Sequence, residues 1–190
     1  MFKALSRYMK QRRALRNNCG LAQHIPILAE IRFDWLQSKG IKGIILDLDN
    51  TIISEDDVYL SPGAIRWIDS TQSIGLKCIL LSNGSRRQRA IIWSERLKLP
   101  LINPARKPLP HAFKQAFRWM KLPPHQVVVI GDSLHTDILG AWWVGCPSIQ
   151  VSSLPHPPRW WEKLMGWAIQ ISYPQDRQLR KFTGSLESEK

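Results

Sequence analysis

The sequence predicts an α/β domain built on a doubly wound parallel sheet, with helices on both faces and therefore three layers. A length of 190 residues and a hydrophobic fraction of 44% suit one globular domain with a substantial core. From Lys42 onward, short apolar runs alternate with stretches of helical periodicity. This alternation indicates parallel strands that are joined by helical crossovers.

The first predicted strand is the apolar run Gly43–Leu46, which ends abruptly in an acidic loop. Ser61–Pro62 then predicts the start of a helix over Ala64–Ile74, with the serine as N-cap and the proline in the first turn. A second apolar run, Cys78–Leu81, follows that helix. We therefore expect a second strand that ends at Ser82.

The second half of the domain repeats this alternation. Ser85 is expected to cap a helix that runs to Lys98, and Val127–Ile130 reads as a strand because it is rich in β-branched residues. A short strand is expected at Leu99–Ile102 and a helix at Pro108–Lys121. A helical stretch is expected from Asp132 to Val144, and a last strand at Ser148–Val151.

Composition divides the chain into four parts. Residues 1–29 are basic with apolar residues at helical spacing, which is typical of an amphipathic helix at an anionic membrane surface, of a solvated arm or of a cleaved transit peptide. The folded domain is expected over residues 30–152, followed by a segment rich in Pro and Trp over 153–174. Residues 175–190 are predicted to be a disordered polar tail.

The net charge limits the partners that the chain is expected to have. Lys and Arg number 27 against 15 Asp and Glu, a formal charge of +12, which favours a polyanion, either a nucleic acid or an anionic membrane. The 3 cysteines are too few and too scattered for a disulfide framework, so we expect the cytoplasm or an equivalent reducing compartment. No run approaches the ~20 apolar residues that span a bilayer, so any membrane association would be peripheral.

Acidic residues stand where two of the predicted strands end, and ligands of a doubly wound sheet bind beyond those ends. Asp47 and Asp49 follow the first strand, and Asp132 follows the strand at Val127–Ile130. The two-residue period of a strand puts Asp47 and Asp49 on one side with Leu48 opposite. Close carboxylates repel one another, and a cluster of oxygen ligands suits Mg²⁺. Asp47 and Asp132 are therefore the predicted metal ligands.

Taken in order, these residues resemble the four motifs of the haloacid dehalogenase-like superfamily. The matching segments are Asp47-Leu48-Asp49-Asn50-Thr51, Ser82, Lys107-Pro108 and Gly131-Asp132-Ser133-Leu134-His135-Thr136-Asp137. The resemblance covers roughly residues 40–150 and implies a Rossmann-like core with aspartate-based, Mg²⁺-dependent chemistry.

The resemblance also implies a role for each matched position. Asp47 is the expected nucleophile that forms an aspartyl-phosphate, and Asp49 is the expected general acid and base, whose backbone carbonyl also binds the metal. Relatives that release halide or pump ions lack a carboxylate at the Asp49 position, so this residue favours a phosphatase. The expected phosphate-binding residues are Thr51, Ser82, Asn83 and Lys107. Asp137 is expected to support them.

The spacing of the motifs leaves no room for a cap domain, and an open site suggests a large or immobilised substrate. The versions of the first and last motifs resemble subfamily IIIA, in particular its YqeG-like, phosphatidylglycerophosphate phosphatase branch. That resemblance implies a phospholipid substrate, the product phosphatidylglycerol and a peripheral contact with an anionic membrane. It also gives the basic arm and Trp160, Trp161 and Trp167 a common purpose at such a surface.

Two other functions remain open on sequence alone. A polynucleotide or nucleotide phosphatase would use the same four motifs, although the chain lacks a recognised basic and aromatic stripe, so no nucleic-acid partner is expected. A noncatalytic module that binds a membrane or a partner would retain only the fold. His135 either contacts the phosphate or is a surface residue, and the oligomeric state is not predicted.

Overall fold

The computed structural model describes residues 23–157, 170–179 and 181–184 of the chain. Within them lies a six-stranded sheet in the order β1-β6-β5-β2-β3-β4, in which every neighbouring pair is parallel. The strands are β1 (Gln23–His24), β2 (Gly43–Leu46), β3 (Lys77–Leu81), β4 (Leu101–Ile102), β5 (Val127–Gly131) and β6 (Ser148–Gln150). The helices are α2 (Phe33–Ser38), α3 (Ala64–Ser73), α4 (Arg87–Leu97), α5 (Pro110–Met120) and α6 (Leu139–Trp143). A single turn of π-helix, Leu134–Ile138, leads directly into α6.

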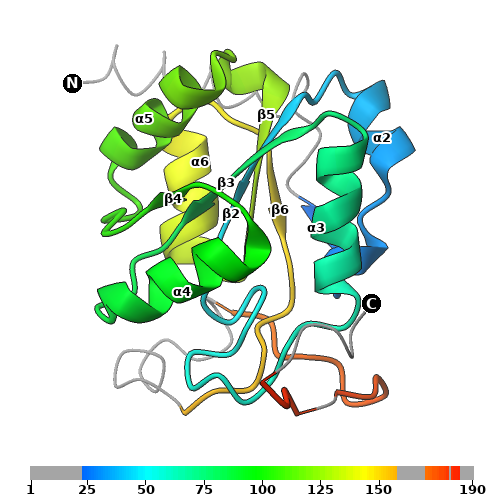
Figure 1. Cartoon of the computed structure of the whole chain (residues 1–190). Coiled ribbons are helices and arrows are strands. Elements are labelled where there is room, and N and C mark those ends of the chain that lie inside the picture. The colour runs from blue at the N-terminus through cyan, green and yellow to red at the C-terminus, as the bar shows by residue number, and fades with distance from the viewer. Residues whose placement is uncertain (1–22, 158–169, 180, 185–190) are drawn as a thin grey trace, which may run out of the picture.

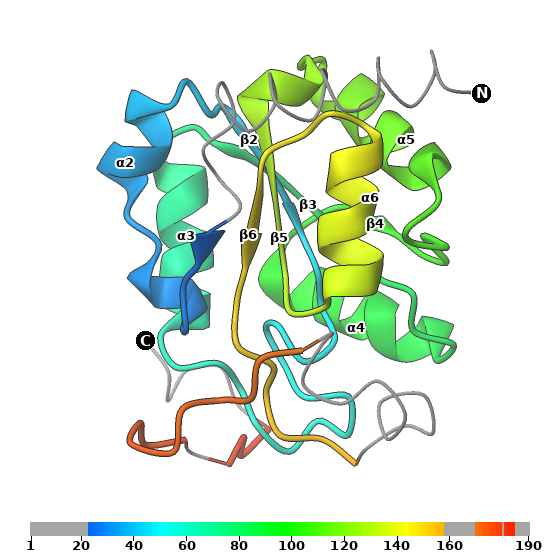
Figure 2. The same cartoon turned by 180° about the vertical axis from the view of Figure 1, so that it is seen from behind.

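Alternate side chains of the central strands enter two separate cores, one on each face of the sheet. Ile44 and Leu46 of β2 pack with α2, α3 and α4, whereas Ile45 packs with α5 and α6. Figures 1 and 2 show α2 and α3 on one side of the sheet and α5 and α6 on the other. Both faces are covered, which explains why apolar residues run without interruption along these strands. The predicted α/β fold with three layers is confirmed.

The order of the strands reverses between β2 and β5, which are neighbours in the middle of the sheet. From β2 the chain moves outward through β3 to β4, and it then returns to β5 on the other side of β2. The backbone N–H of Asp47 donates to the carbonyl oxygen of Ile130 at 2.9 Å, so the ends of the two strands are tied together. A reversal of this kind leaves a crevice beyond the strand ends. Asp47 and Asp132 follow these two strands and therefore border the same crevice.

The connections around this crevice are short. Residues 47–63 join β2 to α3 through a loop in which Ile53 and Leu60 form an isolated antiparallel bridge, and the connection from β3 to β4 holds only α4. Residues 23–157, all of them described, therefore contain no inserted cap domain, as predicted.

Two predicted helix caps are wrong. α3 begins after Gly63, whose φ of 69° is left-handed, and Ser61 lies two residues earlier, so Pro62 is not in the first turn. α4 has Arg86 as its N-cap, with no side-chain hydrogen bond to the helix end, so Ser85 does not cap it. A serine caps a helix only when it directly precedes the first helical residue. Here the loops add one or two residues before each helix begins.

The folded domain begins before residue 30, because Gln23–His24 already pairs with β6 at the edge of the sheet. Residues 1–22 of the predicted arm lie outside the described residues, as do Trp160, Trp161 and Trp167. In the described part of the chain, no helix combines the length and the apolarity needed to cross a bilayer.

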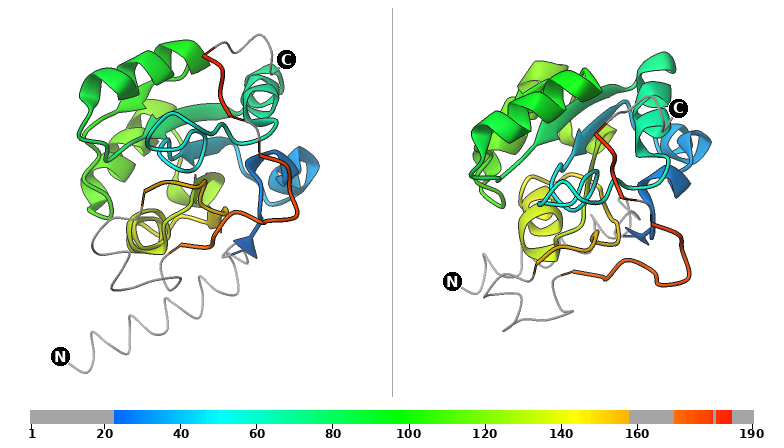
Figure 3. Two further views of the ribbon diagram at one scale, coloured as in Figure 1. Left: turned by 90° about the horizontal axis from the view of Figure 1, so that it is seen from below. Right: turned by 60° about the horizontal axis from the view of Figure 1, so that its bottom comes forward.

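The tail that was predicted to be disordered from Gln175 is folded in the part that the structure describes. Phe182 packs against Trp93 with ring centroids 5.2 Å apart, and its backbone N–H donates to the carbonyl oxygen of Val58 at 2.7 Å. Figure 3 shows this C-terminal segment beside the loop that follows β2, at the end of the sheet where the crevice lies. The composition of the tail is polar, but the partly buried Phe182 and its backbone hydrogen bond connect it to the folded domain.

Candidate active site

A cavity of about 440 Å³ opens beyond the carboxyl ends of β2 and β5. Asp47 and Asp49 line it from the loop after β2, and Asp132 lines it from the end of β5. Lys107 enters from the loop before α5, and Gln170 enters from the C-terminal segment. Four of these five residues were predicted from the sequence, and the structure brings them together.

Lys107 connects two buried carboxylates of the site. Its Nζ donates to Oδ1 of Asp137 at 2.7 Å and to Oδ1 of Asp47. Burial alone would lower the pKa of Lys107, but the charges of Asp137 and Asp47 outweigh it and raise the pKa above its usual value. The ammonium is therefore charged. Gly131 makes this arrangement possible, because a Cβ at that position would overlap the Asp137 carboxylate.

Asp132 is held by donors from three other parts of the chain. Its Oδ2 accepts hydrogen bonds of 2.7 Å from both Ser153 Oγ and Gln170 Nε2. Its backbone carbonyl accepts a bond of 2.9 Å from Gln150 Nε2. Burial, followed by the negative charge of Asp137, raises the pKa of Asp132 to about 7. The side chain is therefore fixed in orientation but poorly stabilised as an anion.

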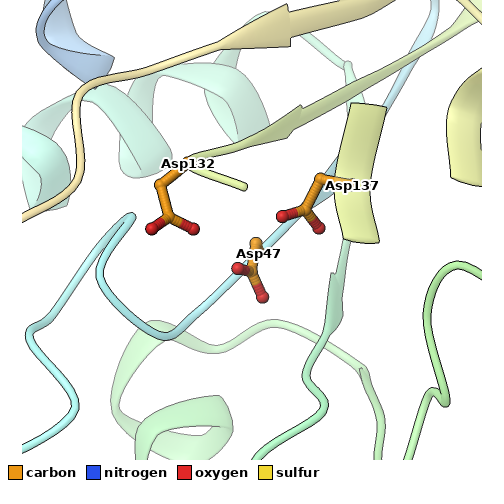
Figure 4. A group of neighbouring side chains, drawn as sticks. All are labelled: Asp47, Asp132 and Asp137. Atoms are coloured by element: carbon orange, nitrogen blue, oxygen red, sulfur yellow. The ribbon is translucent and has the colours of Figure 1, made fainter. Parts of the chain in front are cut away.

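The acidic cluster fits the metal that was predicted from the sequence. Asp47, Asp132 and Asp137 are buried, and each offers an oxygen within 4.8 Å of the others (Figure 4). Lys107 is the cation that the described residues bring to this cluster, where it pairs with Asp47 and Asp137, so two negative charges would remain unbalanced with all three carboxyls ionised. Burial, followed by the charge of Asp137, raises the pKa of Asp47 well above its ordinary value. A divalent cation would supply the missing charge, and oxygen ligands suit Mg²⁺.

Within this cluster, Asp137 is the carboxylate with the most complete hydrogen bonding. Its Oδ1 accepts from Lys107, and its Oδ2 accepts from the Ser133 backbone N–H at 3.3 Å and from Thr136 Oγ1 at 3.1 Å. Because both oxygens are engaged by the protein, Asp137 suits the supporting role expected from the sequence. Asp47 and Asp132 remain the predicted ligands.

Asp49 lies beside the cluster and has its own partners. Ser82 Oγ donates to Asp49 Oδ2 at 2.9 Å and accepts a hydrogen bond of 3.0 Å from the backbone N–H of Gly84. On the other oxygen, Arg89 forms an ion pair with Asp49 Oδ1. Ser82 was expected to bind phosphate, and in this structure its hydroxyl is turned to Asp49. Arg89 was not predicted.

The two remaining phosphate-binding candidates take different places. The side-chain amide of Asn83 lines the cavity and is paired with the backbone of Lys107: Nδ2 donates to its carbonyl at 2.9 Å, and Oδ1 accepts from its N–H at 2.7 Å. Asn83 therefore holds the Lys107 loop against the end of β3. Thr51 is buried, and its Oγ1 has no hydrogen-bond partner among the described residues. Its contact with phosphate stays a prediction.

Sequence analysis missed three residues of the site, which are Arg89, Ser153 and Gln170. Each reaches a predicted acid from a part of the chain with no motif, at separations of 40, 21 and 38 residues. His135 lines the cavity, where its Nδ1 lies 2.8 Å from Ser133 Oγ. His135 therefore lies on the cavity wall, and its contact with the phosphate stays a prediction.

Comparison with known proteins agrees with the fold and the site. The HAD-hydrolase-like family matches residues 104–165, which include Lys107 and the motif from Gly131 to Asp137. The fold, the motifs and this match make the chain similar to haloacid dehalogenase-like proteins. A superfamily hydrolase from Ehrlichia chaffeensis has the same fold, with a TM-score of 0.50 and 19% identity over 59% of this chain and 88% of that one.

Two curated proteins are similar to the chain over part of its length. The chain resembles the probable phosphatase YqeG of Bacillus subtilis, with 43% identity over 105 residues, which are 55% of this chain and 60% of YqeG. It is 30% identical over 109 residues to haloacid dehalogenase-like hydrolase domain-containing protein 3 of Xenopus laevis, over 54% of this chain and 45% of that protein. The chain thus spans less than two thirds of the length of either relative.

Proposed function

We propose that this chain is a Mg²⁺-dependent phosphomonoester hydrolase that forms an aspartyl-phosphate on Asp47. The observation that carries the proposal is the pairing of Asp47 and Asp49 on the wall of one open cavity, with the Lys107 ammonium in contact with Asp47. A nucleophile, a proton donor and a cation for the transferred group are thereby within reach of a single phosphate.

The reaction follows from these positions in two steps. An oxygen of Asp47 attacks phosphorus, the P–O bond to the alcohol breaks, and Asp49 gives its proton to the leaving oxygen. Asp49 then takes a proton from water as that water attacks the phosphorus, which releases phosphate and restores Asp47. Lys107 neutralises charge on the phosphoryl oxygens and on Asp47. Mg²⁺, held by Asp47, Asp132 and the backbone carbonyl of Asp49, would neutralise charge on the same phosphoryl group.

The proposed substrate is phosphatidylglycerophosphate, which would be converted to phosphatidylglycerol. Support comes from the resemblance of the motifs to the YqeG-like branch and from the open, uncapped cavity. Two leucines beside the cavity also support a lipid: Leu109 and Leu134 are 51% and 43% exposed, and their chain neighbours Pro108 and His135 line the cavity. Exposed apolar side chains next in sequence to residues of the cavity wall suit a substrate that stays in a bilayer.

The test is a phosphate-release panel run with Mg²⁺ and with chelator. It compares phosphatidylglycerophosphate in vesicles with nucleotides, 5′- and 3′-phosphorylated oligonucleotides and sugar phosphates. Asp47→Asn should abolish release because the amide cannot attack, whereas Asp34→Asn, an exposed acid of α2, should leave release unchanged. Cleavage of oligonucleotide ends with inert lipid would favour a polynucleotide phosphatase. Full activity in Asp47→Asn would overturn the mechanism.

A further inference from the structure

Arg89 reaches the acid Asp49 from the side of α4 and uses all three nitrogens of its guanidinium. One terminal nitrogen pairs with Asp49 Oδ1, Nε donates to Asp57 Oδ1 at 2.9 Å, and the other terminal nitrogen donates to the Ser54 carbonyl at 2.8 Å. The side chain is only 11% exposed. A planar, fully used guanidinium of this kind holds its partners in one geometry, which a lysine cannot reproduce.

The two oxygens of Asp49 thereby acquire different surroundings. Oδ1 is held by Arg89, and Oδ2 faces Ser82 Oγ at 2.9 Å. A Cβ added to Gly84 would lie 3.0 Å from the same Oδ2, so the absence of a side chain there leaves room beside this oxygen. Asp49 and Gly84 both line the active-site cavity, whereas Arg89 lines a small hollow together with Asp49, Ser82 and Gly84. Arg89 therefore engages Oδ1 and not Oδ2, so Oδ2, whose partner is Ser82 Oγ, is the oxygen that remains for the substrate.

The position of Arg89 is itself fixed from the far side. Asp57 has a left-handed φ of 62°, and its Oδ1 accepts a second hydrogen bond of 2.9 Å from Trp93 Nε1. Trp93 is buried and belongs to the core that contains α3. The guanidinium is thus connected to the core through Asp57 and Trp93 and is not a mobile surface charge.

We propose that Arg89 is a positioning residue for the acid step, because it holds Asp49 Oδ1 so that Oδ2 meets the leaving oxygen of the substrate. The inference rests on the proposed phosphatase function. Arg89 does not touch the substrate, and its effect reaches the reaction through Asp49. Misplacing a catalytic group by about 1 Å can cost on the order of a hundredfold in rate.

The experiment measures kcat/KM for a series of aryl and alkyl phosphates with Mg²⁺ in the full-length protein. kcat/KM covers substrate binding and the transfer of the phosphoryl group to Asp47 and does not include the later hydrolysis of the aspartyl-phosphate. In that transfer the leaving oxygen needs a proton if it is a poor leaving group. Arg89→Ala, Arg89→Lys and Asp57→Asn are compared with Arg96→Ala. Arg96 lies on the same helix, where it stacks over Trp93, so it controls for loss of an arginine and of helix packing.

Arg89→Ala should lose about tenfold to a hundredfold in kcat/KM with alkyl phosphates, but less than about threefold with p-nitrophenyl phosphate, whose leaving group needs no proton. Arg89→Lys keeps the positive charge, and Asp57→Asn keeps the shape of the side chain. Both variants should therefore show the same dependence on the leaving group with smaller losses in kcat/KM. Arg96→Ala should not alter the dependence on the leaving group. An equal loss with every ester in the Arg89 and Asp57 variants, or no loss, would overturn the role of Arg89. Failure of the wild type to hydrolyse any ester would overturn the phosphatase proposal and this inference with it.

Discussion

Lys107 Nζ donates a hydrogen bond of 2.7 Å to Asp137 Oδ1, and the two side chains are 2% and 1% exposed. This pair is the buried link between the motif before α5 and the motif after β5. It also supplies the positive charge that opposes the acidic cluster. The stability of the metal-free protein should therefore depend on Lys107 more than on any exposed lysine.

Lys107→Met should lower the free energy of unfolding of the metal-free protein by about 3 kcal/mol at pH 8, because it leaves buried carboxylates without a cation. The loss should be smaller at pH 5, where those carboxyls can be protonated. Urea unfolding in the presence of chelator measures both values. Lys114→Met, at an exposed position of α5, is the matched control and should change stability by less than about 0.5 kcal/mol. An equal loss at both pH values would argue against unbalanced acids as the cause.

The affinity for Mg²⁺ should fall as the pH is lowered through about 7. Burial, followed by the charge of Asp137, raises the pKa of Asp132 from 3.8 to about 7, so below that pH a proton competes with the metal. Calorimetric titration at pH 8 and pH 6 should show a loss of up to about tenfold per pH unit below 7. Asp132→Asn should bind Mg²⁺ weakly at both values. Wild-type binding that is independent of pH would contradict this prediction.

The same shift has a consequence for stability without metal. The folded protein binds the Asp132 proton more tightly than the unfolded chain, where the pKa returns to about 3.8. This stabilisation is complete below pH ~4 and is lost as the pH rises through ~7. Added Mg²⁺ should therefore raise the melting temperature more at pH 8 than at pH 6, which a thermal-shift series can measure.

The sequence predicted the sheet because its strands are buried on both faces, so apolar residues cluster in short, unmistakable runs. It predicted Asp47, Asp49 and Asp132 because they lie within three residues of the ends of such runs. Side chains that reach the site across the fold leave no local pattern. Arg89 is one arginine among several at the start of α4, and Gln170 lies in a segment with no motif. The direction in which a polar side chain such as that of Arg89 or Gln170 points is set by tertiary contacts that periodicity does not encode.

The basic N-terminal arm can be tested separately from catalysis. Deletion of residues 1–22 spares β1, which begins at Gln23, and removes six basic residues between Lys3 and Arg16. Each basic residue near an anionic surface contributes about 1 kcal/mol, so binding to vesicles rich in phosphatidylglycerol should weaken by at least about tenfold. Hydrolysis of a soluble phosphate ester should not change. The full-length protein with Lys114→Gln and Arg118→Gln controls for the loss of positive charge. If the deleted form binds vesicles as tightly as the full-length protein, the proposed role of the arm is wrong.

Gln170→Ala should weaken Mg²⁺ binding by about tenfold, because Asp132 Oδ2 then loses one of its two donors and is free to rotate away from the metal. Ser153→Ala removes the other donor and should act in the same direction. Calorimetric titration gives the affinity of each variant, and the melting temperature without metal checks the fold. Arg177→Ala is the matched control, since Arg177 lies on the same segment and its half-exposed side chain forms an ion pair with Glu30, at 3.0 Å. If Gln170→Ala binds Mg²⁺ as tightly as Arg177→Ala, the C-terminal segment does not contribute to the metal site. Weaker Mg²⁺ binding in Gln170→Ala but not in Arg177→Ala would establish that a residue beyond the matched family region orients a predicted metal ligand.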